Sequence, residues 1–303
     1  MNSTSEQQDA QHLRMTTAPV PGLILSLSVP SIITCIITSV YNMADTFFVA
    51  QLGTAAVAAV GVVFSISSVL SALGFWMGTG GSSLVSLYLG AREKEKAHCA
   101  ASTGFFLALG LGGVIAAGGL LALEPLMRLL GSTDTILPEA EAYAVPILLA
   151  APFQCSSLAL AQCLRAEGKS KESMAGQLAG GLLNIVLDPL FIYTLGMGIR
   201  GAGAATALSQ VMVWAALLWF YVRGKTSVRI SVRQVARTPR MVKLIFTTGF
   251  PSLCRHCGNA LATIVLNRAA GGFGDTAIAA FSIASRVSGL ALSVSIGFVQ
   301  GLQ

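Results

Sequence analysis

The stretch GGLLNIVLDPLFIYTLG, residues 180–196, places two polar side chains in an otherwise almost wholly apolar run. Asn184 and Asp188 are four residues apart, so on a helix they share one face, one turn from each other. An ionised aspartate at the centre of a bilayer costs about 2.5 to 3.5 kcal/mol on insertion scales. If this helix lies in a membrane, Asp188 is therefore expected to face a cavity or a partner group within the protein.

The composition is typical of a membrane protein. Of the 303 residues, 54% are hydrophobic and 11% are charged, and the mean hydropathy is +0.72. In soluble domains about a quarter of the residues are charged. The sequence therefore predicts an all-α polytopic membrane protein and argues against a soluble enzyme.

Eight apolar segments are long enough to cross a bilayer as helices: residues 20–51, 55–88, 97–123, 139–164, 173–195, 201–222, 244–266 and 276–303. They divide the chain into a flexible cytoplasmic tail (1–19), a first six-helix lobe (20–222), a basic cytoplasmic linker (223–243) and the first two helices of an incomplete second lobe (244–303). The tail lacks the features of a cleaved signal peptide. In the linker, Arg229, Arg233 and Arg237 recur every four residues, which favours an amphipathic helix on anionic lipid.

The distribution of Lys and Arg predicts the orientation. Most of these residues lie in the tail and in the loops after the second, fourth and sixth segments, and the other loops hold only single arginines or none. We expect the protein to lie in an inner or plasma membrane. The positive-inside rule then places its N-terminus in the cytoplasm. Topology therefore explains the net charge of +6 without a nucleic-acid partner.

The chain contains an internal repeat. Aligning Val29-Pro30-Ser31 with Phe250-Pro251-Ser252 gives a match that continues without a gap and places Gly53 on Gly274. The seventh segment thus restarts the first, which predicts two six-helix bundles related by an approximate two-fold axis. Because Gln303 falls on the second segment of the repeat, we expect about eight transmembrane helices to be present and the last four to be absent.

Two carboxylates, Asp45 and Asp188, are the acids that lie well inside the predicted spans. An intramembrane carboxylate usually marks a functional site. Tyr41 and Asn42 lie one helical turn before Asp45, as Asn184 does before Asp188. Burial disfavours an ionised carboxylate, so such groups could exchange H⁺, or Na⁺ held at Asp45, Asn184 and Asp188, for a cationic substrate. The alternative is a hydrogen-bond network that ties two helices together.

Other side chains are candidates for a substrate pocket: Tyr41, Asn42, Phe153, Tyr193 and Gln210. The aromatic ones could equally pack or face lipid. Arg255 and His256 mark the seventh segment, where the arginine could pair with an acid or reach a lipid headgroup. The six cysteines are interpreted as small packing residues, including the Cys254-Arg-His-Cys257 string, and neither a metal nor a cofactor is expected.

Six short motifs, in order along the chain, resemble those of the multidrug and toxic compound extrusion (MATE) family. The similarity covers almost everything after residue 20. The motifs are Pro30 with Asp45-Thr-Phe-Phe-Val and Leu52-Gly53; Leu130-Gly131 followed by Pro138; Arg165-Ala-Glu-Gly168; Asn184-Ile-Val-Leu-Asp188-Pro189; Gly201-Ala-Gly-Ala-Ala-Thr206 with Ser209-Gln210; and Gly249-Phe-Pro-Ser252.

The resemblance implies twelve spans in two V-shaped lobes and export of hydrophobic, often cationic compounds by alternating access, driven by H⁺ or Na⁺. It also implies small hydrophobic cations and membrane lipids as partners, in a protein expected to be monomeric. Asp45, Asn184, Asp188 and Thr206 match the positions of the family's first-lobe ion site. Some members have a coupling glutamate early in the seventh span, where this chain has Arg255 and His256, so the first-lobe acids are the expected coupling site.

Three alternatives remain open at this point. The string Gly272-Phe-Gly-Asp275 matches the G-x-G-D pattern of intramembrane aspartyl proteases, although Asp275 is more simply a helix cap. A lipid-linked oligosaccharide flippase would have a related architecture, with more cationic groups in its cavity. A non-transporting assembly partner is the third possibility.

Overall fold

The computed structural model describes residues 19–224, 226–235, 239–271 and 292–299, and within these ranges it contains helices and no strand. Six helices are long and apolar enough to cross a membrane. They are α2 (Val20–Ala50), α3 (Thr54–Gly90), α4 (Lys94–Leu121), α6 (Leu137–Ala166), α7 (Ser170–Pro189), which continues into the π-helix η1 (Leu190–Thr194), and α8 (Ile199–Val222). The first six predicted spans are therefore confirmed as helices.

The described chain also contains the short helix α5 (Leu123–Leu129), the 3₁₀ turn η2 (Val232–Gln234) and the helix α9 (Pro239–Gly271). The helix α9 covers the predicted seventh span. Of the eighth, only residues 292–299 are described, and they are helical. The all-α fold is confirmed, whereas the count of eight transmembrane helices stays a prediction.

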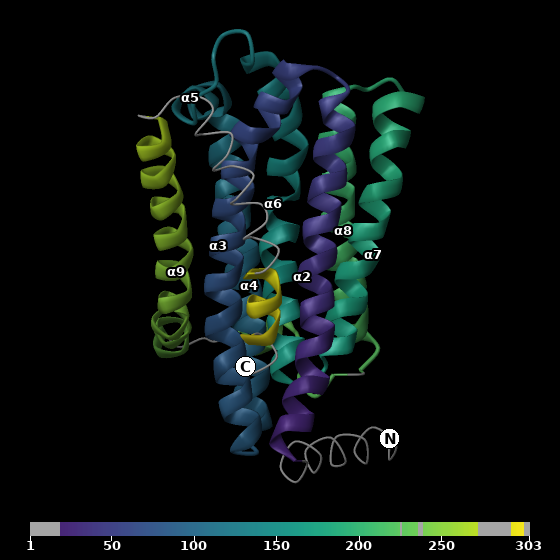
Figure 1. The fold of residues 1–303 in the computed structure, drawn as a ribbon. Helices are drawn as coiled ribbons and strands as arrows, with labels where there is room; N and C mark the ends of the chain where they lie inside the picture. Colours follow the sequence, from purple (N-terminus) through teal and green to yellow (C-terminus); the bar gives the residue numbers. More distant parts are fainter. Residues whose placement is uncertain (1–18, 225, 236–238, 272–291, 300–303) are drawn as a thin grey trace.

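The long helices run side by side, with α3 and α6 at the centre of the bundle (Figure 1). The helix α6 packs against α3, α4 and α8, and α9 packs against α3 at the edge of the bundle. By contrast, α2 packs mainly against α7 and makes few contacts with α3. This arrangement leaves space between α2 and the central helices.

Small side chains allow α6 to occupy the centre. Its buried face includes five alanines (Ala140, Ala144, Ala150, Ala151 and Ala159), all of them at most 3% exposed. Small residues let helix backbones approach closely, which favours association in a bilayer. The central helix thus holds α3, α4 and α8 at fixed positions around the space beside α2.

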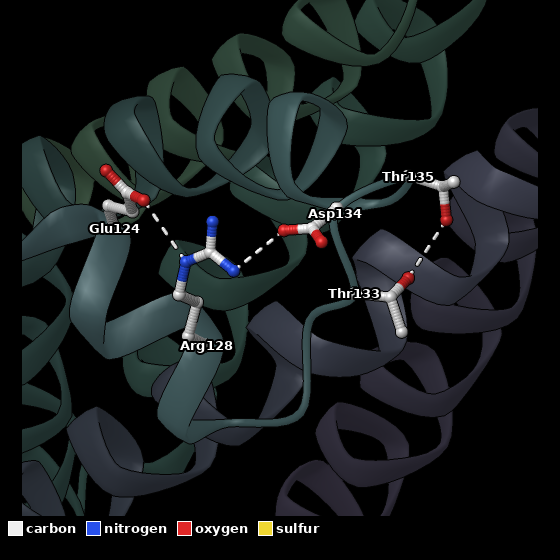
Figure 2. Close-up of polar contacts among 5 residues, drawn as sticks. All are labelled: Glu124, Arg128, Thr133, Asp134 and Thr135. Atoms are coloured by element: carbon white, nitrogen blue, oxygen red, sulfur yellow. Dashed lines mark hydrogen bonds and ion pairs between the residues drawn. The ribbon is translucent and has the colours of Figure 1, made fainter.

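The short helix α5 lies at one end of the bundle (Figure 1), where polar side chains of α5 and of the loop to α6 contact one another (Figure 2). Arg128 donates from Nε to Glu124 at 3.1 Å and from Nη1 to Asp134 at 2.7 Å. The hydroxyls of Thr133 and Thr135 lie 3.0 Å apart in the same loop. These side chains are exposed, so the ion pairs contribute little to stability.

The linker between α8 and α9 differs from its prediction. The backbone N–H of Ser227 donates to Oε2 of Glu167 at 2.6 Å, and that of Arg229 donates to Nδ1 of His98 at 3.1 Å. The N–H of Ser231 donates to the hydroxyl of Ser102, also at 3.1 Å. The expected amphipathic helix is therefore wrong for residues 226–235, because side chains of α4 and of the α6–α7 turn take the backbone donors that a helix would use. Arg237 lies outside the described residues.

The basic loop predicted after the fourth segment is the turn between α6 and α7, and two of its charged side chains are buried. Arg165 is 6% exposed and Glu167 is 4% exposed. Lys169 lies 3.7 Å from the Glu167 carboxylate. Burial raises the pKa of Glu167 from its ordinary 4.5 to about 7, while Lys169 and the N–H of Ser227 act in the opposite direction.

Because the pKa of Glu167 is raised in the folded state, we expect the free energy of unfolding to depend on pH. A raised pKa in the folded state means that its contribution to stability is complete below about 4.5 and is lost as the pH rises through about 7. At about 1.4 kcal/mol per pKa unit, the loss is about 3 kcal/mol. Thermal unfolding of the purified chain between pH 4.5 and 8 measures it. In Glu167→Gln the unfolding temperature should change less with pH over this range. The control is Glu93→Gln, at an exposed ion pair, which should keep the pH dependence of the wild type. Equal pH dependence in the two variants would contradict the prediction.

Candidate functional site

Asp45 lies near the C-terminal end of α2 and is 8% exposed. The hydroxyl of Tyr143, on α6, donates to its Oδ2 at 3.2 Å. Gly203, on α8, packs directly against the Tyr143 backbone, and a Cβ at this glycine would lie 2.7 Å from the Tyr143 carbonyl oxygen. The small residues at the start of α8 therefore let three helices meet around Asp45.

Asp188 and Asn184 form the second part of the site, on α7. Their exposed fractions are 0% and 2%. Nδ2 of Asn184 donates to Oδ1 of Asp188 at 3.2 Å. The two side chains thus share one helix face, as their spacing predicts.

Three oxygens of this group have no hydrogen-bond partner among the described residues: Oδ1 of Asp45, Oδ1 of Asn184 and Oδ2 of Asp188. Each is buried, and a buried polar atom without a partner is costly. The two carboxylates also lie close enough to repel each other when both are ionised. A proton or a hard cation such as Na⁺, which prefers oxygen ligands, would remove both costs.

The backbone changes its helix type directly after Asp188. The helix α7 ends at Pro189 and continues as the π-helix η1, in which the N–H of Leu195 donates to the carbonyl of Leu190 at 2.9 Å. Proline has no N–H and disturbs the turn before it. Single π-turns within helices occur frequently at functional sites.

Two adjoining cavities open beside Asp45 and Asn184, whereas Asp188 lies on the wall of neither. The smaller has a volume of about 340 Å³ and is lined by Asp45, Asn42 and Tyr143, among others. The larger has a volume of about 550 Å³ and extends along α2, α6 and α7 to Arg165. Residues on the walls of both include Tyr41, Asn184, Thr206, Gln210 and His256. Most of the proposed site residues therefore meet in one connected space.

Two of the candidate pocket residues do not line these cavities. Phe153 packs against Trp214 with ring centres 5.1 Å apart. Tyr193 is 44% exposed, and its hydroxyl donates to the carbonyl of Phe48 at 2.8 Å. A place for these two aromatic side chains in a substrate pocket stays a prediction. All six cysteines are free thiols in the structure.

Sequence reasoning did not identify Tyr143, Gln154 or Arg165 as wall residues. A usable signal existed for the first two, because each is an isolated polar side chain within an apolar span. Arg165 gave a misleading signal, since it belongs to a run of charges that ordinarily marks a solvated loop.

Comparisons with known proteins agree with this geometry. The sequence profile of the MatE family matches residues 30–190. The multidrug export protein MepA of Staphylococcus saprophyticus is 29% identical over 92% of this chain, and MepA of Staphylococcus aureus (strain MRSA252) is 25% identical over 97%. The chain spans 62% and 66% of the lengths of these two relatives.

Solved structures show the same fold. The crystal structure of a point mutant of a MATE transporter superposes with a TM-score of 0.90 at 32% identity, covering 95% of this chain and 65% of that one. A structure of MATE in complex with MaL6 gives a TM-score of 0.88 at 33% identity, covering 92% and 62%. Such proteins are transporters and not enzymes. The G-x-G-D string on which the protease alternative depends, residues 272–275, lies outside the described residues. The chain therefore belongs to the MatE family of multi-pass membrane transporters.

Proposed function

We propose that this chain acts in a cation-coupled antiporter that exports hydrophobic, often cationic drugs or toxic compounds by alternating access. The observation that carries the proposal is a pair of buried carboxylates. Asp45 lies on the wall of the smaller cavity, and Asp188 lies behind that wall, where it accepts a hydrogen bond from the wall residue Asn184. The multidrug export activity in the names of its relatives supports the same function.

The coupling ion is H⁺ or Na⁺, and it binds at Asp45, Asn184 and Asp188, with Thr206 nearby on the cavity wall. When the site is empty, two negative charges lie beside the cavity, and a cationic substrate is attracted there. When the ion binds, the charge falls and the substrate is released. Exchange follows because the ion and the cationic substrate compete for the same carboxylates.

The orientation of the first lobe follows from its charges. The start of α2 and the linker lie at one end of the bundle, and α5 lies at the other (Figure 1). Most basic residues gather at the first end. We place that end, with residues 1–19 and the linker 223–243, in the cytoplasm of an inner or plasma membrane. The first lobe (20–222) then presents its carboxylates near the outer face, and residues 244–303 begin the second.

Reconstitution tests the proposal. The purified 303-residue chain is placed in liposomes, and a lipophilic cationic dye is followed by fluorescence after a pH or Na⁺ gradient is imposed. We expect dye to move against the ion gradient, and an ionophore that collapses the gradient should stop it. Folded protein that moves no dye under either gradient would refute the antiport function.

Pro189 provides a test of the conformational step. Its position between α7 and η1 suggests that this junction changes when Asp188 binds or loses its ion. In Pro189→Ala the missing backbone N–H is restored and the α-helix can continue, so we expect transport to fall about tenfold if the hinge contributes about 1.4 kcal/mol. Pro146→Ala, at a proline inside α6, is the control. Unchanged transport and pH dependence in Pro189→Ala would remove this role.

One observation favours a second candidate, a flippase for lipid-linked oligosaccharides. That alternative predicts cationic groups in the cavity, and both Arg165 and Arg255 lie on the wall of the larger one.

A further inference from the structure

Arg165 is a buried cation on the wall of the larger cavity. It lies in the last turn of α6 and is 6% exposed. Its Nε donates to Oε1 of Gln162 at 3.2 Å, and its Nη1 donates to the hydroxyl of Ser173 at 3.4 Å. Both partners are neutral, so the hydrogen bonds leave the positive charge without a counter-charge.

The part of the chain that the structure describes provides no carboxylate for this guanidinium. Its ion pairs join Lys96 to Glu93, Arg128 to Glu124 and Asp134, and Lys169 to Glu167. Glu167 is two residues away in sequence but receives the N–H of Ser227. The carbonyl end of α6 offers partial compensation through the helix dipole. A buried charge is otherwise stable only when paired, which points to an anion supplied from outside the chain.

The two cavities carry opposite charges. Among their described lining residues, the larger has Arg165 and Arg255 and no carboxylate, whereas the smaller has Asp45 and neither Lys nor Arg. His256 lies on the walls of both. Tyr143, which binds Asp45, and Arg165 lie at opposite ends of α6. At 1.5 Å per residue, their backbones are about 33 Å apart along the helix. Arg165 therefore acts on a ligand separately from the acidic site.

The larger cavity also has an apolar side. Phe75, Leu158, Val213, Leu292 and Ile296 lie on its wall. A volume of about 550 Å³ is within the range of pockets for drug-sized molecules. An apolar wall with a few charged groups suits a molecule that has a hydrophobic tail and a single anionic group.

We propose that Arg165, assisted by Arg255, forms a subsite for the anionic head of an amphiphile, a carboxylate or a phosphate, in the larger cavity. The planar guanidinium binds such groups with two parallel hydrogen bonds. The inference deepens the proposed export function, on which it rests, by naming a substrate class that the acidic site alone would not attract. The subsite is tested by measuring ligand binding, whereas the export function is tested by measuring dye transport, so either proposal can fail without the other.

The test is a fluorescence titration of the purified chain in maltoside detergent with 11-(dansylamino)undecanoate and with its uncharged methyl ester. We expect the acid to bind at least about tenfold more tightly than the ester, as a charged hydrogen bond implies. Arg165→Gln should remove this preference, Arg165→Lys should keep part of it and Arg255→Gln should reduce it. Binding of the ester should be similar in all variants.

Arg200→Gln is the matched control, because Arg200 is exposed and lies outside both cavities. It should bind the acid as the wild type does. If Arg165→Gln does not fold, Arg255→Gln decides, since Arg255 is exposed on α9. Equal affinities of the wild type for acid and ester would overturn the proposal. Full preference for the acid in folded Arg165→Gln, or in Arg255→Gln when that variant decides, would do the same.

Competition identifies the source of the anion. Displacement of the dansyl acid by phosphatidylglycerol, but not by phosphatidylcholine, assigns the subsite to an anionic lipid headgroup. Displacement by decyl phosphate but not by phosphatidylglycerol assigns it to a soluble amphiphile. If neither phosphatidylglycerol nor decyl phosphate displaces the acid, the proposal fails for phosphates, and the subsite is assigned to a carboxylate alone.

Discussion

Asp45→Asn and Asp188→Asn are each expected to lower gradient-driven dye export at least about tenfold, the cost of losing one charged interaction. Each change keeps the size of the side chain but removes its negative charge and replaces one of its two oxygens with an NH₂ group, which cannot bind H⁺ or Na⁺. The remaining transport should no longer depend on the external pH or Na⁺ concentration. Initial efflux rates across a series of pH and Na⁺ values, in reconstituted liposomes, measure both effects.

Asp134→Asn is the control for this pair. Asp134 is exposed in the α5–α6 loop and pairs only with Arg128 among the described residues (Figure 2), so the same chemical change there removes a weak surface ion pair. Its transport should equal that of the wild type. Undiminished, pH-independent export in both Asp45→Asn and Asp188→Asn would show that the carboxylates only tie helices together.

The part of the site that the sequence predicts is the local part. Asn184 and Asp188 are four residues apart on one helix, and helical geometry alone brings their side chains together. The contact between Asp45 and Tyr143 joins residues that are far apart in the chain, so no periodicity predicts it. Arg165 shows the opposite case, because its charged neighbours indicated a solvated loop, whereas packing of α6 against α7 buries it.

In the fold, too, the sequence predicts local features but not contacts between distant residues. Long apolar runs predict α2, α3, α4, α6, α7 and α8, because a bilayer requires that each spanning backbone satisfy its own hydrogen bonds. The prediction for the linker was wrong because its backbone donors find distant partners, including His98 and Glu167, that a periodic pattern cannot indicate. The π-helix after Pro189 was likewise absent from the prediction.

The second large effect concerns the contact between α3 and α9. Gly249 on α9 packs directly against the carbonyl oxygen of Trp76, and Gly80 on α3 packs against that of Ile245. A methyl group at either glycine would collide with backbone atoms, which cannot rotate away as a side chain can. We expect Gly249→Ala and Gly80→Ala each to lower the free energy of unfolding by about 1–3 kcal/mol, the usual cost of overpacking. Thermal unfolding of the purified chain in detergent measures the loss.

Gly258→Ala is the matched control on the same helix. A Cβ at Gly258 meets no atom within 4 Å, and alanine favours a helix over glycine by about 0.8–1 kcal/mol. This variant should therefore be as stable as the wild type or slightly more stable. The internal repeat predicts that α9 is the first helix of a second lobe. If it is, the packing of α9 on α3 joins the two lobes. The wall residues Arg255 and His256 lie on α9 and depend on that contact. If Gly249→Ala proved as stable as Gly258→Ala, the close approach of the two helices would not exist in the folded protein.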